Sequence, residues 1–220
     1  MSLSWTKRNL DWYNLLLEEL GQHEEAPILM MLAGINGAGK STFHGQYLKE
    51  LGIEYLNPDE IAKLDLGYGV NLTREQAKEV GKLVADVRDQ YIEAQMTFAF
   101  ETVLSDPVGE KVEVLRKARE KGYVVILFFI FLESPEIAIE RVKYRVANGG
   151  HGLPEQTIRD RYPRILENLI RSVGVPNYTV ILDNSLREQY ELVGLVRDDE
   201  LILNGHVRPR WATEYFQNLK

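Results

Sequence analysis

The sequence predicts an α/β fold: a three-layer sandwich built on a mainly parallel five-stranded sheet and completed by a C-terminal β-hairpin. Short apolar segments alternate with longer segments of helical periodicity between residues 28 and 182, which is the pattern of parallel strands joined by right-handed helical crossovers. Residues 123–132 are almost uniformly apolar, as expected for a central strand covered by helices on both faces. Ligands of such sheets bind at the carboxyl ends of the strands, so we expect the chemistry in the loops that follow the strands.

The strand–helix order of the first half follows from periodicity and from residues that begin or end helices. The expected elements are a strand over residues 28–33, a helix over 41–51, a strand over 53–56, a helix over 73–95 and a strand over 97–102. Gly52 ends the first helix, because glycine readily adopts the left-handed conformation of a helix C-terminus. Thr73 and Gln76 have the spacing of a capping box at the start of the second helix.

The second half continues the same alternation. The expected elements are a helix over residues 108–118, a strand over 123–132, helices over 134–146 and 155–172, and a strand over 178–182. Ser134-Pro135 is a typical helix start, and the glycine-rich residues 148–152 separate the last two helices. Pro163 lies inside the last helix, where proline costs about 3 kcal/mol, so we expect a kink or two shorter helices there.

The ends of the chain are expected to extend this core. The expected parts are an N-terminal helical extension over residues 1–26, a core over 27–185 with a lid at about 141–165, and a hairpin and tail of the same domain over 186–220. An amphipathic helix is predicted over Trp5–Leu20, ended by Gly21. The hairpin pairs Glu191–Arg197 with Glu200–Asn204.

Composition excludes several classes of function. Of the 220 residues, 45% are hydrophobic and 27% charged, as in an average globular domain. The absence of cysteine excludes a disulfide framework, a zinc ribbon, an iron–sulfur cluster and a cysteine nucleophile. The net charge of −7 argues against nucleic acid or an anionic membrane as a partner. Because the longest apolar run is too short to span a bilayer and no signal peptide pattern is present, we expect a cytoplasmic protein.

A glycine-rich loop follows the first strand and carries the strongest functional signal. Residues 34–41, Gly34-Ile35-Asn36-Gly37-Ala38-Gly39-Lys40-Ser41, match the P-loop pattern G-x-x-x-x-G-K-[ST]. The backbone N–H groups of such a loop and the helix N-terminus behind it bind phosphate. We therefore expect nucleotide binding, with Lys40 reaching the β- and γ-phosphates and the Ser41 hydroxyl holding Mg²⁺. The expected nucleotide-binding residues are Gly34, Asn36, Gly37, Ala38, Gly39, Lys40, Ser41 and Thr42.

Other motifs narrow the class of P-loop protein. A transporter-type ATPase needs a Leu-Ser-Gly-Gly-Gln-like signature and a strand that ends in Asp-Glu, and a GTPase needs Asn-Lys-x-Asp; all three are absent from the sequence. The remaining class is the small kinases, which transfer the γ-phosphoryl group of ATP to a bound small molecule.

Three acids follow predicted strands. Asp59 stands where the acceptor site of a small kinase would lie and is the favoured catalytic base, with helix capping as the alternative. Glu101 could bind Mg²⁺ through water or bind the acceptor, with a solvent-facing acid as the alternative. Asp183 is expected to shape a turn.

Arginines cluster around the glycine-rich break. Arg141 and Arg145 are four residues apart and share one helix face, and Arg159, Arg161 and Arg164 follow the break. Small kinases close an arginine-bearing lid over the transferring phosphate and thereby exclude water. The alternative is a solvated charged face. His151, in the break, is interpreted as an ordinary loop residue.

Together these blocks resemble the zeta-toxin family, and above all its stand-alone bacterial kinases. The blocks are Gly34–Thr42, Asn57-Pro58-Asp59, Phe100-Glu101-Thr102, Arg141 with Arg145, and Gly149-Gly150-His151. The resemblance implies ATP- and Mg²⁺-dependent phosphorylation of UDP-N-acetylglucosamine at its 3′-hydroxyl. It also implies a small antitoxin protein as a possible partner.

The resemblance assigns roles to individual residues. Lys40 and Ser41 would bind phosphate and metal, Asp59 would deprotonate the acceptor, Glu101 and Thr102 would hold the sugar, and Arg141 and Arg145 would be lid cations. Two departures stand out: founding toxins have proline where Asn36 stands, and glycine between the counterparts of Glu101 and Thr102. Two alternatives stay open: a metabolic kinase for a sugar acid, vitamin or nucleoside, and a nucleotide-binding regulatory switch.

Overall fold

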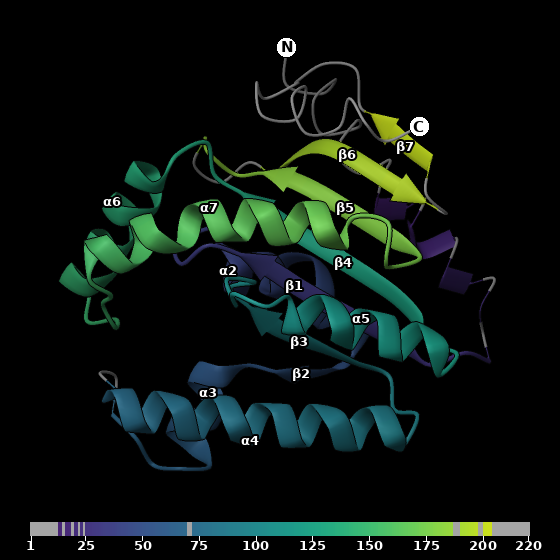
Figure 1. Cartoon of the computed structure of the whole chain (residues 1–220), viewed down its shortest axis with the longest axis horizontal. Coiled ribbons are helices and arrows are strands. Elements are labelled where there is room, and N and C mark those ends of the chain that lie inside the picture. Colours follow the sequence, from purple (N-terminus) through teal and green to yellow (C-terminus); the bar gives the residue numbers. More distant parts are fainter. Residues whose placement is uncertain are drawn as a thin grey trace.

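A single seven-stranded sheet organises the chain, with the strand order β2-β3-β1-β4-β5-β6-β7 (Figure 1). The strands are β1 Ile28–Gly34, β2 Glu54–Leu56, β3 Phe98–Thr102, β4 Val124–Phe131, β5 Tyr178–Asp183, β6 Glu191–Arg197 and β7 Glu200–Leu203. The first five strands in this order pair in parallel, and β6 and β7 add to β5 as antiparallel neighbours. The predicted α/β class, the five-stranded parallel sheet and the C-terminal hairpin are confirmed.

The structure is a computed structural model that describes most of the core and part of each end. The described residues are 13–14, 16–18, 20–21, 23, 25–69, 72–186, 190–197 and 200–203. Residues 13–14, 16–18 and 20–21 are helical, in line with the expected N-terminal helix, and the other residues of Trp5–Leu20 lie outside the described part. Asn204, the predicted end of the hairpin, also lies outside it. The three expected parts of the chain and the lid boundaries stay predictions.

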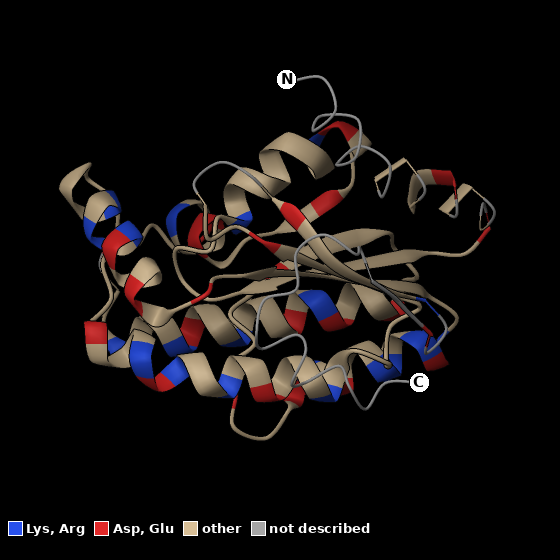
Figure 2. Cartoon of the chain, turned by 90° about the horizontal axis from the view of Figure 1, so that it is seen from above, with Lys and Arg blue, Asp and Glu red and all other residues tan. Residues whose placement is uncertain are grey.

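Helices cover both faces of the sheet, as Figure 2 shows. They are α2 Lys40–Phe43, α3 Pro58–Leu64, α4 Arg74–Glu93, α5 Glu110–Glu120, α6 Pro135–Ala147 and α7 Glu155–Ser172. Helices α5 and α7 cross one face of the sheet in Figure 1, and the buried Phe43 after the phosphate loop packs against Phe128 of β4, with ring centroids 5.3 Å apart. Every residue of β4 is buried, which confirms the central strand. Among the described residues, no helix is long and apolar enough to cross a membrane.

Two of the predicted helices differ in detail from the structure. The helix expected over residues 41–51 is helical throughout but changes type, from α2 to a π-helical turn over His44–Leu48 and a 3₁₀ turn over Lys49–Leu51. Of the two outcomes expected at Pro163, the division into two shorter helices is wrong, because α7 is one helix of 18 residues. Its buried side chains, Ile158, Ile165 and Leu169, hold it in place against the core.

Helices α3 and α4 share a small hydrophobic cluster and also pack against the main core through Ile92. Ala62 of α3 and Val80 and Val84 of α4 make up this second hydrophobic cluster. The capping box predicted at Thr73 and Gln76 is present at the start of α4. In Figure 1 this pair of helices lies beyond the β2 edge of the sheet, so it faces the carboxyl ends of the strands from the side and can form one wall of a site there.

Candidate active site

The phosphate loop joins β1 to α2, and its glycines occupy positions that exclude a side chain. Gly34 has φ +148°, and a Cβ there would lie 2.4 Å from the carbonyl oxygen of Ile130. Gly39 has φ +96°, and a Cβ there would lie 2.6 Å from Nδ2 of Asn184. Both positions therefore require glycine, as the sequence pattern predicted. The backbone at this loop forms the cradle that phosphate oxygens need.

Lys40 lies at the floor of the site with its charge held by the loop itself. Its Nζ donates to the carbonyl oxygens of Gly34, at 2.9 Å, and Ile35, at 3.2 Å. It also lies 3.5 Å from Oε1 of Glu101. Burial lowers the pKa of Lys40, and the nearby Glu101 carboxylate acts in the opposite direction. The paired lysine is thus kept next to the loop, where a triphosphate would bind.

Glu101, at the end of β3, connects three side chains. Besides Lys40, the hydroxyl of Ser41 donates to its Oε2 at 3.3 Å and the hydroxyl of Tyr55 donates to the same oxygen at 2.7 Å. The alternative of a solvent-facing acid is therefore wrong, because β1 and β3 are neighbours and bring Glu101 against the phosphate loop. Burial, followed by the Glu101 charge, raises the pKa of Tyr55 well above its usual value.

The residues fit a magnesium ion. Ser41 and Glu101 supply a hydroxyl and a carboxylate oxygen next to the phosphate cradle, and Mg²⁺ prefers oxygen ligands and usually takes one or two from the protein and the rest from phosphates and water. Across the described ranges no cluster of three or more His, Asp or Glu side chains is arranged to hold a metal. A site completed by nucleotide phosphates is the arrangement that these residues suit.

Asp59 lies in the first turn of α3, on the opposite side of the site. The Asn57 side chain caps this helix by accepting from the Asp59 N–H at 2.9 Å. The side chain that caps this helix is therefore that of Asn57 and not that of Asp59. The Asp59 carboxylate lies 3.6 Å from Nε2 of His151. His151, interpreted from the sequence as an ordinary loop residue, thus links the α6–α7 loop to α3.

Arg141 and Arg145 both lie on α6, yet they do different things. Arg141 donates to the carbonyl oxygens of Asn184, at 2.6 Å, and Gly37, at 3.5 Å, and so touches the phosphate loop. Arg145 donates through Nε to the carbonyl oxygen of His151 at 3.1 Å. Its Nη2 is buried and has no hydrogen-bond partner in the described part of the chain. An unpaired buried guanidinium nitrogen is costly, which favours a ligand as its missing partner.

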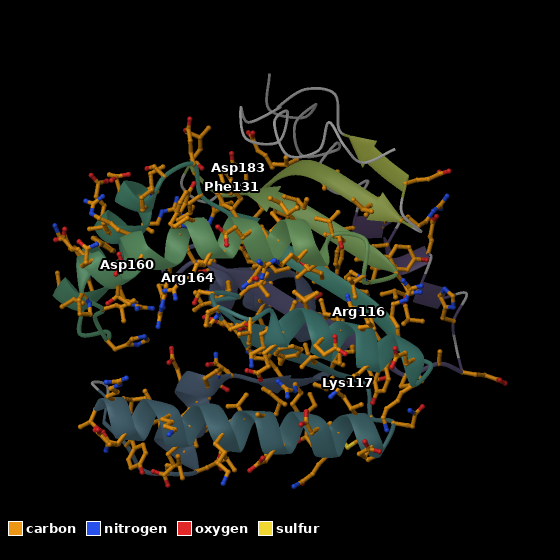
Figure 3. All side chains as sticks on the ribbon, viewed as in Figure 1. Arg116, Lys117, Phe131, Asp160, Arg164 and Asp183 are labelled. Carbon is orange, nitrogen blue, oxygen red and sulfur yellow. The ribbon has the colours of Figure 1, made fainter. Side chains whose placement is uncertain are left out.

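Of the three later arginines, Arg161 alone has a recorded contact with the phosphate loop. Its Nη1 donates to Oδ1 of Asn36 at 3.0 Å. Arg159 pairs with Glu136. Arg164 donates to the backbone carbonyl of Asp160 at 3.2 Å, and Figure 3 shows Asp160 and Arg164 together on α7. The group of arginines was visible in the sequence, but which one faces the loop was not.

Two residues beyond the predicted set shape the loop from behind. Asn184, buried after β5, donates through Nδ2 to the Ala38 carbonyl at 2.8 Å, and the Tyr190 hydroxyl donates to the Gly39 carbonyl at 2.7 Å. Burial raises the pKa of Tyr190 to about 12. Asp183 accepts from the backbone of Ser185 at 2.7 Å and shapes the turn, as predicted; it lies beside Phe131 at the strand ends in Figure 3.

One cavity of about 620 Å³ brings these groups together. It is lined by residues of the phosphate loop, by Asp59, Glu101 and Thr102, and by Arg141, Arg145 and His151. Volumes of this size are typical of small-molecule sites. Six of the eight predicted nucleotide-binding residues line this space together with the predicted acceptor residues and the two arginines of α6, whereas Gly34 and Ala38 do not line it.

Comparison with known sequences decides the family. The sequence model of the zeta toxin family matches residues 15–184, more than half of the chain. The chain belongs to the zeta toxin family. With the phosphate loop on a kinase-type sheet, this membership makes the protein a phosphotransferase of the P-loop kinase class.

Individual proteins similar to this zeta-toxin-family chain include one curated protein and several solved structures. A protein of unknown function from Haemophilus influenzae is 28% identical over 129 residues, which are 59% of this chain and 88% of that protein. A solved chain of the PezAT toxin–antitoxin system of Streptococcus pneumoniae has a TM-score of 0.55 and 20% identity, covering 78% of this chain and 72% of that one.

A solved AvrRxo1-ORF1:-ORF2 complex with ATP has a TM-score of 0.64 and 16% identity, covering 98% of this chain and 71% of that one. A solved structure described as a putative kinase from Chloroflexus aurantiacus has a TM-score of 0.53 and 17% identity, covering 75% of this chain and 92% of that one. At these identities the solved structures support the fold.

Proposed function

We propose that the protein transfers the γ-phosphoryl group of ATP to a hydroxyl of a nucleotide sugar, with UDP-N-acetylglucosamine and its 3′-hydroxyl as the acceptor. The observation that carries the proposal is the single cavity that joins the phosphate loop to Asp59, Glu101 and Thr102. A kinase needs its phosphoryl donor and its acceptor in one space from which water can be excluded. Membership of the zeta toxin family supports the same reaction.

The chain's own residues account for each requirement of the transfer. The phosphate loop and Lys40 bind the triphosphate, and Ser41, with Glu101 behind it, would hold Mg²⁺, which neutralises charge on the β- and γ-phosphates when bound. Arg141 and Arg145 face the same cavity from α6 and stabilise the charge that develops on the transferring group.

Asp59 is the base in this proposal. The acceptor oxygen attacks the γ-phosphorus, the bond to the β-phosphate oxygen breaks, ADP leaves, and the hydroxyl proton passes to the Asp59 carboxylate. Glu101 and Thr102 orient the sugar from the end of β3. This chain has no glycine between these two residues, and this departure concerns the role of Thr102 and the identity of the acceptor. A sugar acid, vitamin or nucleoside is the alternative acceptor.

An antitoxin is proposed as a protein partner. The PezAT system is described as a toxin–antitoxin pair, and the AvrRxo1 chain was solved in complex with a second protein. A small helical protein that covers the nucleotide end of the cavity would block ATP. Co-purification of the chain with the product of a neighbouring small reading frame, with loss of ATP binding in the complex, would support this partner.

The function is tested by phosphoryl transfer from ATP in the presence of Mg²⁺ to a panel of nucleotide sugars, sugar acids and nucleosides. We expect product with UDP-N-acetylglucosamine, no transfer by Lys40→Ala, and a kcat about 10²- to 10⁴-fold lower for Asp59→Asn because a general base is lost. Asp65→Asn, on the exposed end of the same helix, is the matched control and should behave as the wild type.

Three results would contradict parts of the proposal. Unimpaired transfer by Asp59→Asn would remove Asp59 as the base. Transfer to another member of the panel, but not to the nucleotide sugar, would replace the acceptor. ATP binding without acceptor-dependent ADP release on any compound would favour a regulatory switch.

A further inference from the structure

The cavity has an arm that the transfer described above does not use. Beyond Glu101 it continues between α4 and the loop that joins β3 to α5. The lining residues of this arm are Gly81, Val84, Ala85 and Arg88 on α4 and Ser105, Asp106 and Lys111 on the other side. The arm lies on the acceptor side of the site, because α4 packs with α3, which carries Asp59.

We propose that this arm is a subsite that binds an anionic group of the acceptor through Arg88 and Lys111, while Asp106 accepts a hydrogen bond from the same molecule. The proposal deepens the proposed function and rests on it for the identity of the molecule as an acceptor. It assigns a chemical class: a compound with a phosphate or carboxylate group remote from its reacting hydroxyl.

Arg88 is a buried cation with unused binding capacity. The residue is 5% exposed, and its Nε and Nη2 donate to Oδ1 of the adjacent Asp89 at 2.9 and 2.7 Å. No hydrogen bond from Nη1 is found among the described residues. The Asp89 side chain is 64% exposed, so this one carboxylate is shared with water. A buried guanidinium is costly unless it is fully paired, and its planar fork suits phosphate or carboxylate oxygens.

Asp106 presents an unpaired acceptor to the same space. Its Oδ1 accepts from the Glu110 N–H at 2.5 Å, whereas its Oδ2 is buried without a partner in the described part of the chain. A buried carboxylate oxygen without a donor is costly. A ligand O–H or N–H group would supply the missing donor.

The loop that carries Asp106 is held rigidly. The Asn168 side chain, 1% exposed, donates to the carbonyl oxygens of Leu104 and Asp106 at 3.0 and 2.7 Å. Leu104 has φ +59°, a conformation that costs a non-glycine residue of the order of 1–3 kcal/mol and that occurs often at ligand sites. The unpaired oxygen is therefore in a fixed position, as a binding group should be.

Lys111 adds a second cation at the mouth of the arm. Its Nζ lies 2.8 Å from Oε1 of Glu110, and its side chain is 23% exposed. The hydrogen bond from Lys111 and, to a smaller extent, the charge of Arg88 lower the pKa of Glu110, which places the two cations near one carboxylate. The arm therefore combines two cations, each already beside one partly exposed carboxylate, with one unpaired acceptor; an anion flanked by a hydroxyl or an amide would use the donors that these carboxylates leave over.

Two kinds of acceptor carry this chemistry. A nucleotide sugar offers its diphosphate with sugar and base donors on either side, and a sugar acid offers its carboxylate with hydroxyl groups. A neutral sugar offers donors but no anion, so it would leave Arg88 unpaired.

The test is a calorimetric titration of the full chain after its phosphate loop has been saturated with Mg²⁺ and the non-hydrolysable analogue AMP-PNP. The probes are two matched pairs, UDP-N-acetylglucosamine with N-acetylglucosamine and gluconate with glucose. We expect one anionic probe to bind at least about tenfold more tightly than its neutral partner, since hydrogen bonds to a charged group are worth that factor or more. The pair that shows the difference identifies the source of the anion.

Variants tie the preference to the arm. Arg88→Met should weaken the anionic probe about 10- to 100-fold and leave the neutral probe and AMP-PNP unchanged. Lys111→Met, at a partly exposed position, should weaken the same probe less. Asp106→Asn keeps an oxygen for the Glu110 N–H. It should weaken both members of a pair, because it replaces the oxygen that accepts the ligand's hydrogen bond with an N–H₂ donor and leaves the contacts of the anion in place. Lys117→Met is the control: Lys117 lies on α5 (Figure 3) and does not line this cavity.

The outcomes separate the subsite from the proposed function. Equal binding of the anionic and neutral probes, binding of no probe, or unchanged binding in a folded Arg88→Met or Lys111→Met variant overturns the subsite. If Arg88→Met does not fold, as judged by its thermal unfolding, Lys111→Met decides. Phosphoryl transfer by the wild type is measured separately. Transfer without a preference for the anionic probe supports the proposed function and overturns the subsite. Preferential binding of the anionic probe without transfer supports the subsite and overturns the proposed function.

Discussion

At the scale of single residues, Glu101 is the group on which the nucleotide end of the site depends. One carboxylate contacts the Lys40 ammonium, the Ser41 hydroxyl and the Tyr55 hydroxyl. The lysine and the serine are the first two residues of α2, whereas the tyrosine comes from β2 and the glutamate from β3, so the contact joins the ends of two strands to the start of this helix. The ring of Tyr55 stacks on His44, with centroids 3.7 Å apart, which fixes the direction of its hydroxyl. Side chains outside the phosphate loop therefore fix the positions of the Lys40 ammonium and the Ser41 hydroxyl relative to each other, which a site for phosphoryl transfer requires.

The glycines of the loop give a residue-scale prediction. Gly39→Ala forces a Cβ to within 2.6 Å of Nδ2 of Asn184 and 2.9 Å of the Tyr190 hydroxyl at a φ of +96°. We expect a loss of about 1–3 kcal/mol in the free energy of unfolding and a loss of most nucleotide affinity, measured by urea unfolding and by titration with AMP-PNP. Gly45→Ala is the control, because a Cβ there has no atom within 4 Å. Wild-type nucleotide affinity in Gly39→Ala would show that the loop relaxes without consequence.

The candidate site could be predicted from the sequence where it is local. The phosphate loop is eight consecutive residues, so its pattern alone identifies Lys40 and Ser41. The contacts of Tyr55, His151 and Arg161 depend on which side chains of distant elements meet, and no sequence pattern specifies that. Arg161 and Arg164 are both on α7, but the rotation of the helix about its axis, set by tertiary packing, decides that Arg161 reaches Asn36.

At the scale of elements, the α6–α7 loop, residues 148–154, connects α6 with α3 beside the cavity, which His151 lines. Arg145 holds it from within, since its own carbonyl accepts from the Gly150 N–H at 2.9 Å and its Nε donates to the His151 carbonyl at 3.1 Å. A Cβ at Gly150 would lie 2.5 Å from Cγ of Arg145, so the close turn requires glycine. The loop contacts α3 through the side chains of His151 and Asp59.

His151→Ala tests this connection. Both side chains are partly exposed, so the pair contributes less than about 1 kcal/mol, and we expect kcat to fall about two- to fivefold because Asp59 is less well oriented. Nucleotide affinity should not change, since His151 does not touch the phosphate loop. Steady-state kinetics at saturating ATP measures the effect, and His23→Ala is the control. A changed AMP-PNP affinity with an unchanged kcat would place His151 at the nucleotide instead.

Pro163 gives a prediction about stability. The proline removes a backbone donor from the interior of α7, at a cost of about 3 kcal/mol, and stiffens the unfolded chain by about 1 kcal/mol in return. Pro163→Ala should therefore raise the free energy of unfolding by about 2 kcal/mol, measured by urea unfolding. Glu167→Ala, exposed on the same helix, should change it by less than about 0.5 kcal/mol. An unchanged or lower stability in Pro163→Ala would mean that α7 already bends to accommodate the ring.

The elements of the fold were largely predictable, and the exceptions have physical causes. Apolar runs and caps identified all seven strands and the helices α4 to α7, because strand alternation and helix starts are local properties. Helix α3 is not among the helices that the sequence predicts, because its seven residues bury a single one, Ala62, and show little periodicity. The unbroken α7 shows tertiary packing overriding the local effect of Pro163.

At the scale of the whole molecule, two hydrophobic cores meet at the cavity. The main core holds the sheet and the helices that carry the phosphate loop and the lid arginines, and the small α3–α4 core carries Asp59 and Arg88. The two cores are in contact, because Ile92 of α4 belongs to the main core and Ile61 of α3 packs against both, so donor and acceptor residues are carried by neighbouring, connected clusters. The chain has a net charge of −7 and can still bind an anionic nucleotide, because charged residues of both signs are spread along the helices (Figure 2) while Lys40, Arg141 and Arg145 line one space.

Nucleotide binding should stabilise the whole molecule, because the phosphate loop contacts β1, α2, α6 and the residues after β5. At a free concentration of AMP-PNP and Mg²⁺ about 100 times the dissociation constant, a ligand specific for the folded state adds about 2.7 kcal/mol. For a chain of this length each kcal/mol raises Tm by about 2–4 °C, so we expect a rise of about 5–11 °C in calorimetric unfolding. Lys40→Ala should abolish the rise, and Lys49→Ala, exposed in the same helical segment, should retain it. A full rise in Lys40→Ala would place the nucleotide outside the phosphate loop, and removal of Mg²⁺ by EDTA should lower the rise if Ser41 and Glu101 hold the ion.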